Sequence, residues 1–445
     1  MRKRNFTKED VVKMVKEKNV RFIKLWFVDI LGQLKSFTIV SGELENALEE
    51  GMGFDGSSIE GFARIFESDL VAMPDPTTFT LLPWRPKEDA VAKMFCDVLT
   101  PEREPYIGDP RYILRKNLKK MKEAGYDSFN LGPELEYFYF VNEKTPQTID
   151  EGGYFDFLPL DLAHDLRRET IQSLEEMGIP VEYSHHEVAR SQHEIDLRYG
   201  PALEMADDVI THKVTVKAIA WTKQLYASFM PKPVFGENGS GMHTHMSLFK
   251  GDKNAFFDAN QKYHLSDDAK YFIAGVMKHA REICAITNQW VNSYKRLVPG
   301  YEAPVYITWA QRNRSALIRV PMYKPGKEKA TRIELRFPDP ACNPYLAFSV
   351  MLAAGLDGIR NKYELPEASE RDVYHLNKEQ RESLNIQMLP GSLIEAIQEA
   401  EKSEFLKQTL GEHIYNKFIE NKNIEWDRYR MQVTDFELNE YLPIL

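Results

Sequence analysis

Aromatic and apolar residues dominate residues 131–140, Leu-Gly-Pro-Glu-Leu-Glu-Tyr-Phe-Tyr-Phe, and predict a β-strand after the Gly-Pro turn. Because strand side chains alternate between two faces, Glu134 and Glu136 share one face with Phe138 and Phe140. Aromatic residues on both faces indicate a strand that is covered on both sides. Two carboxylates on a covered face repel each other and lose hydration, so nearby cations have to compensate them. The alternative is a half-exposed edge strand with solvated glutamates, and this segment alone leaves both interpretations open.

Nearer the N-terminus, residues 22–29 and 34–40 predict two strands around a Leu-Gly-Gln turn. A glycine-rich segment follows at residues 51–61. It contains too many glycines for a helix or a strand, so we expect a loop whose backbone adopts angles that other residues avoid. Loops of this composition often carry function.

The clearest boundary signal is a cluster of prolines and charged residues over residues 101–110. It predicts a small N-terminal domain over residues 1–105 and a large domain over residues 106–445. In the large domain, predicted strands alternate with helices, including a long helix over residues 205–225, and the last third is mostly helical.

The chain closes on an apolar tail, residues 441–445, after a capping-box pair formed by Thr434 and Glu437. An apolar tail either packs into its own fold or docks on a second subunit. The sequence leaves both open.

Composition narrows the class of protein. A chain of 445 residues with 43% hydrophobic and 28% charged residues is ordinary for a soluble globular protein. Its net charge of −10 argues against nucleic acid or an anionic membrane as the main partner. Local clusters of arginine can still bind a small anionic substrate.

The segments that would indicate secretion or membrane insertion are missing from the sequence. The basic N-terminus lacks an apolar stretch behind it, and the longest apolar run, residues 345–356, is too short to span a bilayer. Cys96, Cys284 and Cys342 are odd in number and scattered, which suits reduced thiols. We therefore expect a cytoplasmic protein.

Three further segments place polar side chains on single strand faces. Residues 192–198 put Gln192, Glu194 and Asp196 on one face, although a polar strand edge explains that segment equally well. A glycine-rich loop over residues 235–241 leads into His243-Thr-His245, which directs two imidazoles one way.

Arg332, Glu334 and Arg336 also share a strand face. A salt-bridged face is one interpretation. The other is a grip on a metal and anionic groups together, because guanidinium pairs with carboxylate and phosphate in a two-pronged geometry. Many carboxylates with an imidazole suit Mg²⁺ or Mn²⁺ better than zinc, and metals with arginines indicate phosphoryl chemistry on an anionic substrate.

At these residues the chain resembles glutamine synthetases of the bacterial class I type. The matching segments run in the family's order from the N-terminal domain through the catalytic core: residues 54–59, Glu134-x-Glu136, residues 185–189, 232–247, 292–304, 312–315 and 332–340. The resemblance implies an α+β fold, with a small β-grasp-like domain and a catalytic domain built on an open antiparallel β-barrel flanked by helices. It also implies ligation of ammonia to glutamate, driven by ATP through a γ-glutamyl phosphate.

Carried over by position, the resemblance implies two or more Mg²⁺ or Mn²⁺ ions per subunit. One would be held by Glu136, Glu187 and Glu194. A second would be held by Glu134, His243 and Glu334.

The resemblance also assigns substrate residues. Glutamate and the transferring phosphoryl group would be held by Asn238, Gly239, Arg296, Glu302, Arg314 and Arg336. The nucleotide would be held by Glu182, Tyr199, His245, Ser247, Arg319, Lys329 and Arg332. The catalytic residues would be Asp55, which binds ammonium and takes its proton, Glu302, which closes over the site, and Arg314.

Assembly and regulation follow from the same likeness. In this family the Asp55 loop reaches a neighbouring subunit, which implies a homododecamer of two stacked hexamers. Arg64 matches the position through which glutamine inhibits the feedback-inhibited, I-alpha subtype. The chain departs from the family in residues 189–192, where a glycine usually precedes the glutamine. Two other interpretations remain: a related ligase that joins glutamate to a larger amine, and a relative without catalysis.

Overall fold

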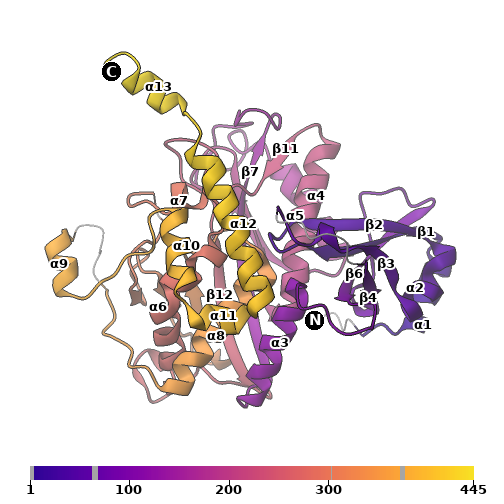
Figure 1. Ribbon diagram of the computed structural model, residues 1–445, viewed down its shortest axis with the longest axis horizontal. Helices are drawn as coiled ribbons and strands as arrows, with labels where there is room; N and C mark the ends of the chain where they lie inside the picture. Colours follow the sequence, from indigo (N-terminus) through magenta and orange to yellow (C-terminus); the bar gives the residue numbers. More distant parts are fainter. Residues whose placement is uncertain (1–4, 63–68, 302, 371–375) are drawn as a thin grey trace.

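The computed structural model describes residues 5–62, 69–301, 303–370 and 376–445. Two β-sheets organise them, a smaller one near the N-terminus, on the right of Figure 1, and a larger one flanked by helices. The class is α+β, as the resemblance implies.

The N-terminal sheet has the order β2-β1-β6-β4-β3, with β5 paired to β6. Its strands are β1 Val20–Val28, β2 Leu34–Val40, β3 Met52–Asp55, β4 Asp69–Pro74, β5 Thr80–Leu81 and β6 Ala90–Leu99. β1 and β2 form the predicted antiparallel pair, and β1 runs parallel to β6. The prediction of a loop over residues 51–61 is wrong in part, because its first residues form β3 and pair with β4.

The large sheet has the order β14-β15-β16-β12-β7-β9-β8. Its strands are β7 Ser128–Phe140, β8 Val181–His186, β9 Gln192–Leu197, β12 Met242–Lys250, β14 Trp309–Ala310, β15 Ile318–Arg319 and β16 Ile333–Leu335, with the short β10 Gly200–Pro201, β11 Tyr226–Ser228 and β13 Lys253–Asn254 beside them. Its pairs are antiparallel except β14 with β15. The predicted antiparallel arrangement therefore holds for all but that pair.

Helices cover the large sheet (Figure 1). The helices are α1 Lys8–Glu17, α2 Leu44–Glu50, α3 Pro110–Glu123, α4 His164–Glu176, α5 Ala202–Thr222, α6 Asp267–Thr287, α7 Ser293–Arg296, α8 Pro344–Asn361, α9 Lys378–Ser383, α10 Leu393–Glu401, α11 Glu404–Leu410, α12 Glu412–Arg430 and α13 Asp435–Tyr441. The backbones of α6 and α8 approach closely, because a Cβ added to Gly275 would lie 2.2 Å from the Ala354 carbonyl oxygen.

Strand β7 lies in the middle of the large sheet, between β12 and β9. The predicted Gly-Pro turn is wrong: Gly132 and Pro133 lie inside β7 and pair with His245 and Thr244 of β12. Proline is tolerated there because pairing with β9 begins only at Glu134. The predicted faces are confirmed. Phe138 and Phe140 pack in one small cluster, whereas Tyr137 and Tyr139 on the opposite face belong to the main core.

The C-terminal helix α13 extends away from the rest of the chain (Figure 1). Thr434 caps it through the predicted capping box. The apolar side chains of Phe436, Leu442, Ile444 and Leu445 are exposed, so the tail does not pack into its own fold. Among the described residues, no helix is long and apolar enough to cross a membrane.

Candidate active site

The register of the large sheet brings the predicted acids and imidazoles together. Glu134 of β7 lies opposite His243 of β12, and Glu136 lies opposite Glu194 of β9. On the far side of β9, His185 of β8 lies opposite Glu194. Because neighbouring strands lie about 5 Å apart, residues that alternate toward one face on adjacent strands form a continuous patch.

The first three-residue group, here the Glu134 group, consists of Glu134, His243 and Glu334. Each contributes one ligand atom, and these atoms lie within 4.8 Å of one another. His243 Nδ1 lies 3.4 Å from Glu134 Oε2 and 3.7 Å from Glu334 Oε1. This is the full set that the resemblance implies for one of the two metals.

The second group, here the Glu187 group, contains Glu187, Glu194 and His185 within the same spacing. His185 Nε2 lies 2.8 Å from Glu187 Oε1, and within the described ranges its buried Nδ1 has no hydrogen-bond partner. Glu136, predicted as the third ligand, lines the same cavity. Its Oε2 accepts hydrogen bonds from Gln192 Nε2 at 3.0 Å and from the Gly241 amide at 2.9 Å.

The two groups differ in their electrostatics. Burial and the charge of Glu187 raise the pKa of Glu136 to about 8. Burial, with the charges of Asp196 and Glu136, raises the pKa of Glu194 well above its ordinary value. Burial also acts on Glu134, but hydrogen bonds from His243 and His245 outweigh it and hold that pKa well below its ordinary value.

At Glu136 the charge of Arg296 does not offset burial and the neighbouring carboxylate, whereas at Glu134 the two imidazoles do offset burial. Clustered carboxylate oxygens with an imidazole nitrogen are a donor set that accepts Mg²⁺ or Mn²⁺. A divalent cation at the Glu187 group would supply the missing charge. The residues present thus fit the metals that the sequence predicts.

A cavity of about 710 Å³ opens above both groups. It collects the predicted glutamate residues that the structure describes: Asn238, Gly239, Arg296, Arg314 and Arg336. Arg336 Nε donates to Glu334 Oε1 at 3.2 Å, and its buried Nη1 has no hydrogen-bond partner among the described residues. Arg296 is held by main-chain carbonyls instead, with Nη1 2.7 Å from the Phe337 oxygen. This cavity is suited to a small anion.

A second cavity of about 330 Å³ lies on the other side of Glu134. It is lined by six of the seven predicted nucleotide residues: Glu182, Tyr199, His245, Ser247, Lys329 and Arg332. The seventh, Arg319, lines the larger cavity and forms an ion pair with Glu334. Glu134 lines both cavities, and His245 Nε2 donates to Glu134 Oε1 at 2.8 Å.

Three predicted residues stand apart. Asp55 is exposed on β3, where its carboxylate accepts a hydrogen bond from the Ser57 amide at 2.9 Å. Within the described part of this chain it lines neither cavity. Glu302 and Arg64 lie outside the described residues.

The structure also adds residues that sequence reasoning did not assign. His185 joins the Glu187 group, and Asp196 faces Glu134 across β7 and β9. Burial raises the pKa of Asp196 to about 6. The strand pattern contained a signal for Asp196, which alternates in phase with Glu194 on β9. It contained none for His185, because Glu187 lies beyond the end of β8.

Comparison with known families gives two matches that together cover most of the chain. Residues 107–441 match the catalytic domain of glutamine synthetase, and residues 19–101 match its beta-grasp domain.

Individual relatives extend over almost the whole chain. Glutamine synthetase from Methanosarcina mazei is 53% identical over 443 residues, which cover 99% of this chain and 98% of the relative. The glutamine synthetase from Staphylococcus aureus is 50% identical over 446 residues, 99% of both chains. A solved structure titled GmaS/ADP complex is 30% identical with a TM-score of 0.88, and covers 98% of this chain and 99% of its own.

Proposed function

The chain belongs to the glutamine synthetase family, and from this premise we propose that its larger cavity binds glutamate and its smaller cavity binds ATP. It is an ATP-dependent glutamate–ammonia ligase, which joins ammonia to glutamate through a γ-glutamyl phosphate. The observation that carries the assignment is Glu134, the acid that lines both cavities. In the proposed reaction, a phosphoryl group would pass from the nucleotide to glutamate beside Glu134.

Each of the two acidic groups would hold one divalent cation. The Glu134 group would hold one through Glu134, His243 and Glu334. The second cation would be held by Glu136, Glu187 and Glu194, with His185 as a further donor. When bound, the cations supply positive charge to phosphate oxygens and to the transferring phosphoryl group. The raised pKa of Glu136 and of Glu194 supports a cation at the second group.

The glutamate site would be formed by Asn238, Gly239, Arg296, Arg314 and Arg336. The buried Nη1 of Arg336 has no hydrogen-bond partner within the part of the chain that the structure describes, which supports this assignment, because a carboxylate or phosphoryl oxygen would satisfy it. The guanidinium of Arg296 donates hydrogen bonds to main-chain carbonyls. We therefore assign Arg296 chiefly to shaping the cavity.

In the smaller cavity, Arg332 Nε donates to His245 Nδ1 at 3.3 Å, which leaves His245 Nε2 to donate to Glu134. Arg332 and His245 thus tie the nucleotide site to the Glu134 group. The exposed ring of Tyr199 at the cavity edge is suited to stacking on a base.

Glu302 would close over the larger cavity and shield the acyl phosphate from water. Asp55 would bind ammonium and take its proton. Since Asp55 is exposed and lines neither cavity among the described residues, we propose that it completes the site of a neighbouring subunit. This requires an oligomer, which we propose to be a dodecamer of two stacked hexamers joined by the exposed C-terminal tail.

Arg64 would mediate feedback inhibition by glutamine, as in the I-alpha subtype. Arg64→Ala should then relieve inhibition by glutamine without lowering the uninhibited rate; equal inhibition of both proteins would reject the assignment. We also propose a cytoplasmic location, which the three free, buried cysteines support.

The test of the proposed function is phosphate release from ATP with glutamate and Mg²⁺ or Mn²⁺, with ammonia and with larger amines as acceptors. Ammonia should be the preferred acceptor, since the relatives at 50% and 53% identity are glutamine synthetases. A strong preference for a larger amine would support the related ligase instead. No phosphate release with any acceptor would reject the proposed activity.

A further inference from the structure

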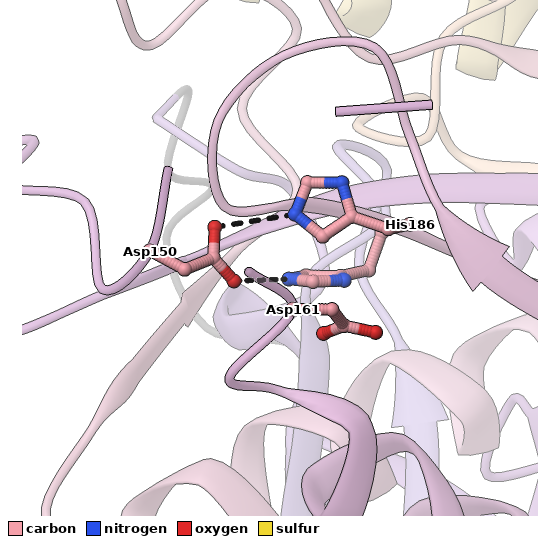
Figure 2. Close-up of side chains that lie close together, drawn as sticks. Asp150, Asp161 and His186 are labelled. Carbon is pink, nitrogen blue, oxygen red and sulfur yellow. Dashed lines mark hydrogen bonds and ion pairs between the residues drawn. The ribbon is translucent and has the colours of Figure 1, made fainter. Parts of the chain in front are cut away.

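A third group of potential metal ligands lies beside the proposed active site, fully buried. Asp150, Asp161, His186 and His193 each offer one ligand atom within 4.8 Å of the others, and three of them are labelled in Figure 2. His186 directly precedes Glu187, and His193 directly precedes Glu194. The group therefore adjoins two of the proposed metal ligands.

A guanidinium already occupies the place of a cation in this group. Arg167 donates to Asp161 through two bonds of 2.6 and 3.1 Å, and its Nη1 also lies 2.8 Å from His193 Nδ1. Because a guanidinium only donates, His193 Nδ1 accepts and the proton of the neutral ring lies on Nε2. The buried Nε2 has no hydrogen-bond partner in the described part of the chain and lies 4.0 Å from Asp150 Oδ2. His193 thus presents an N–H instead of a metal-binding lone pair.

Asp150 connects this buried group to the turn between β8 and β9. Its Oδ1 accepts a hydrogen bond from the Ser191 amide at 2.8 Å. The same oxygen accepts one from His186 Nε2 at 3.2 Å (Figure 2). His186 Nδ1 donates in turn to the carbonyl oxygen of Glu187 at 2.7 Å. One buried carboxylate therefore fixes both ends of the turn that carries Glu187.

The conformation of the turn depends on Ser191. Ser191 has φ of +58°, a left-handed angle that costs a non-glycine residue energy unless its surroundings enforce it. Its hydroxyl accepts from the amides of Ile149 at 2.7 Å and Asp150 at 3.0 Å. This explains why the family usually has glycine at this position, and how the present chain holds serine there.

We propose that Asp150 is a positioning residue for Glu187 and Glu194, with Ser191 as its backbone partner, so that metal affinity at the Glu187 group depends on a carboxylate that does not touch the metal. The inference rests on the proposed assignment of Glu187 and Glu194 as metal ligands. Hydrogen-bonding partners of metal ligands typically change affinity by about 10- to 100-fold when they are lost.

The experiment titrates the full-length protein with Mn²⁺ and follows free Mn²⁺ by electron paramagnetic resonance. Glu187→Gln should remove the Mn²⁺ site of the Glu187 group, and Glu334→Gln should remove that of the Glu134 group. The two variants thereby identify the two classes of site in the titration. Asp150→Asn should weaken the class that Glu187→Gln removes by about 10- to 100-fold and leave the other class unchanged. Its glutamine synthesis should recover at high Mn²⁺.

Two further variants separate positioning from general destabilisation. Ser191→Val disfavours the left-handed angle and should weaken the same Mn²⁺ class, even if Asp150→Asn folds poorly. The carboxylate of Asp357 on α8 accepts a hydrogen bond from the buried His279 on α6. Asp357→Asn should therefore lower thermal stability without changing either class of Mn²⁺ site.

The outcomes are distinct. If Glu187→Gln and Glu334→Gln both keep two classes of Mn²⁺ site, the metal assignment itself is wrong. If those variants each lose one class while Asp150→Asn and Ser191→Val bind Mn²⁺ like the wild type, the positioning role alone is overturned. A third tightly bound metal that Asp161→Asn removes would show an open metal site here and would equally overturn the inference.

Discussion

At the scale of single residues, the pKa values of two acids on one strand differ because of the side chains around them. Glu134 and Glu136 lie two residues apart on β7, yet imidazoles lower the pKa of Glu134 while burial and Glu187 raise the pKa of Glu136 to about 8. Without a cation, Glu136 is therefore a source of repulsion in the folded protein. The metal-free fold therefore disfavours the anion of Glu136, the form that the proposed metal site would use.

Glu136→Gln tests this repulsion. A neutral side chain of the same shape can still accept the hydrogen bonds from Gln192 and Gly241. We expect the metal-free variant to melt a few degrees higher than the wild type at pH 8 in chelator, and to gain less from added Mn²⁺. Scanning calorimetry with and without Mn²⁺ measures both effects. A lower melting temperature in chelator would contradict the repulsion.

The buried side chain of His212 should make the stability of the protein depend on pH. Its ring is fully buried on α5 between Tyr137 and Phe229, and neither ring nitrogen has a hydrogen-bond partner among the residues that the structure describes. Burial lowers the pKa of His212 to about 3. The unfolded chain binds a proton near pH 6.5 whereas the folded chain does not. The neutral His212 therefore contributes fully to the free energy of unfolding above about pH 6.5. As the pH falls below that value, this free energy decreases by up to about 1.4 kcal/mol per pH unit.

His212→Phe removes that proton. Its unfolding free energy should fall less than that of the wild type between pH 6.5 and pH 5, as denaturant titrations at several pH values would measure. The difference in slope is the informative quantity, since the substitution also changes packing. Parallel pH profiles would show that His212 is protonated in the folded protein.

At the scale of elements, strand periodicity made much of the site predictable. Alternation placed Glu134 with Glu136 and His243 with His245. The grouping of Glu134 with His243 and Glu334 came instead from the family resemblance, and the structure brings these three residues together. Periodicity did not reveal that Pro133 continues a strand, because its tolerance depends on where β9 stops pairing. Nor did it place His185 in a ligand group, since this follows from the pairing of β8 with β9. Register between distant strands is a tertiary property.

The contact between α6 and α8 offers a prediction at this scale. A Cβ on Gly275 would lie 2.2 Å from the Ala354 carbonyl oxygen and 2.7 Å from the Gly358 amide nitrogen, so the helices would have to separate. Gly275→Ala should cost about 1–3 kcal/mol of stability, as overpacking does. Gly42→Ala is the matched control, because nothing lies within 4 Å of its added Cβ. Equal melting temperatures of the two variants would contradict the close approach.

At the scale of the whole molecule, the C-terminal tail exposes apolar side chains that do not pack against the rest of the chain. The tail exposes Phe436, Leu442, Ile444 and Leu445. Asp55 is also exposed and, within the described residues, lines neither of the two cavities of the proposed active site. The sequence alone could not decide whether the tail packs inward, because an apolar segment satisfies either outcome. Both features support the proposed assembly, in which a site draws residues from two subunits.

Mixing two inactive variants tests that assembly directly. Asp55→Asn and Glu302→Ala should each lose most glutamine synthesis while still binding ATP. If Asp55 serves a neighbour's site, subunits that are dissociated, mixed and reassembled contain sites with an intact Asp55 from one subunit and an intact Glu302 from the next. Random mixing in equal amounts should then restore about a quarter of wild-type activity, because each site draws one residue from each of two subunits. If both residues served the same chain's site, every subunit would carry one defect and the mixture would stay inactive.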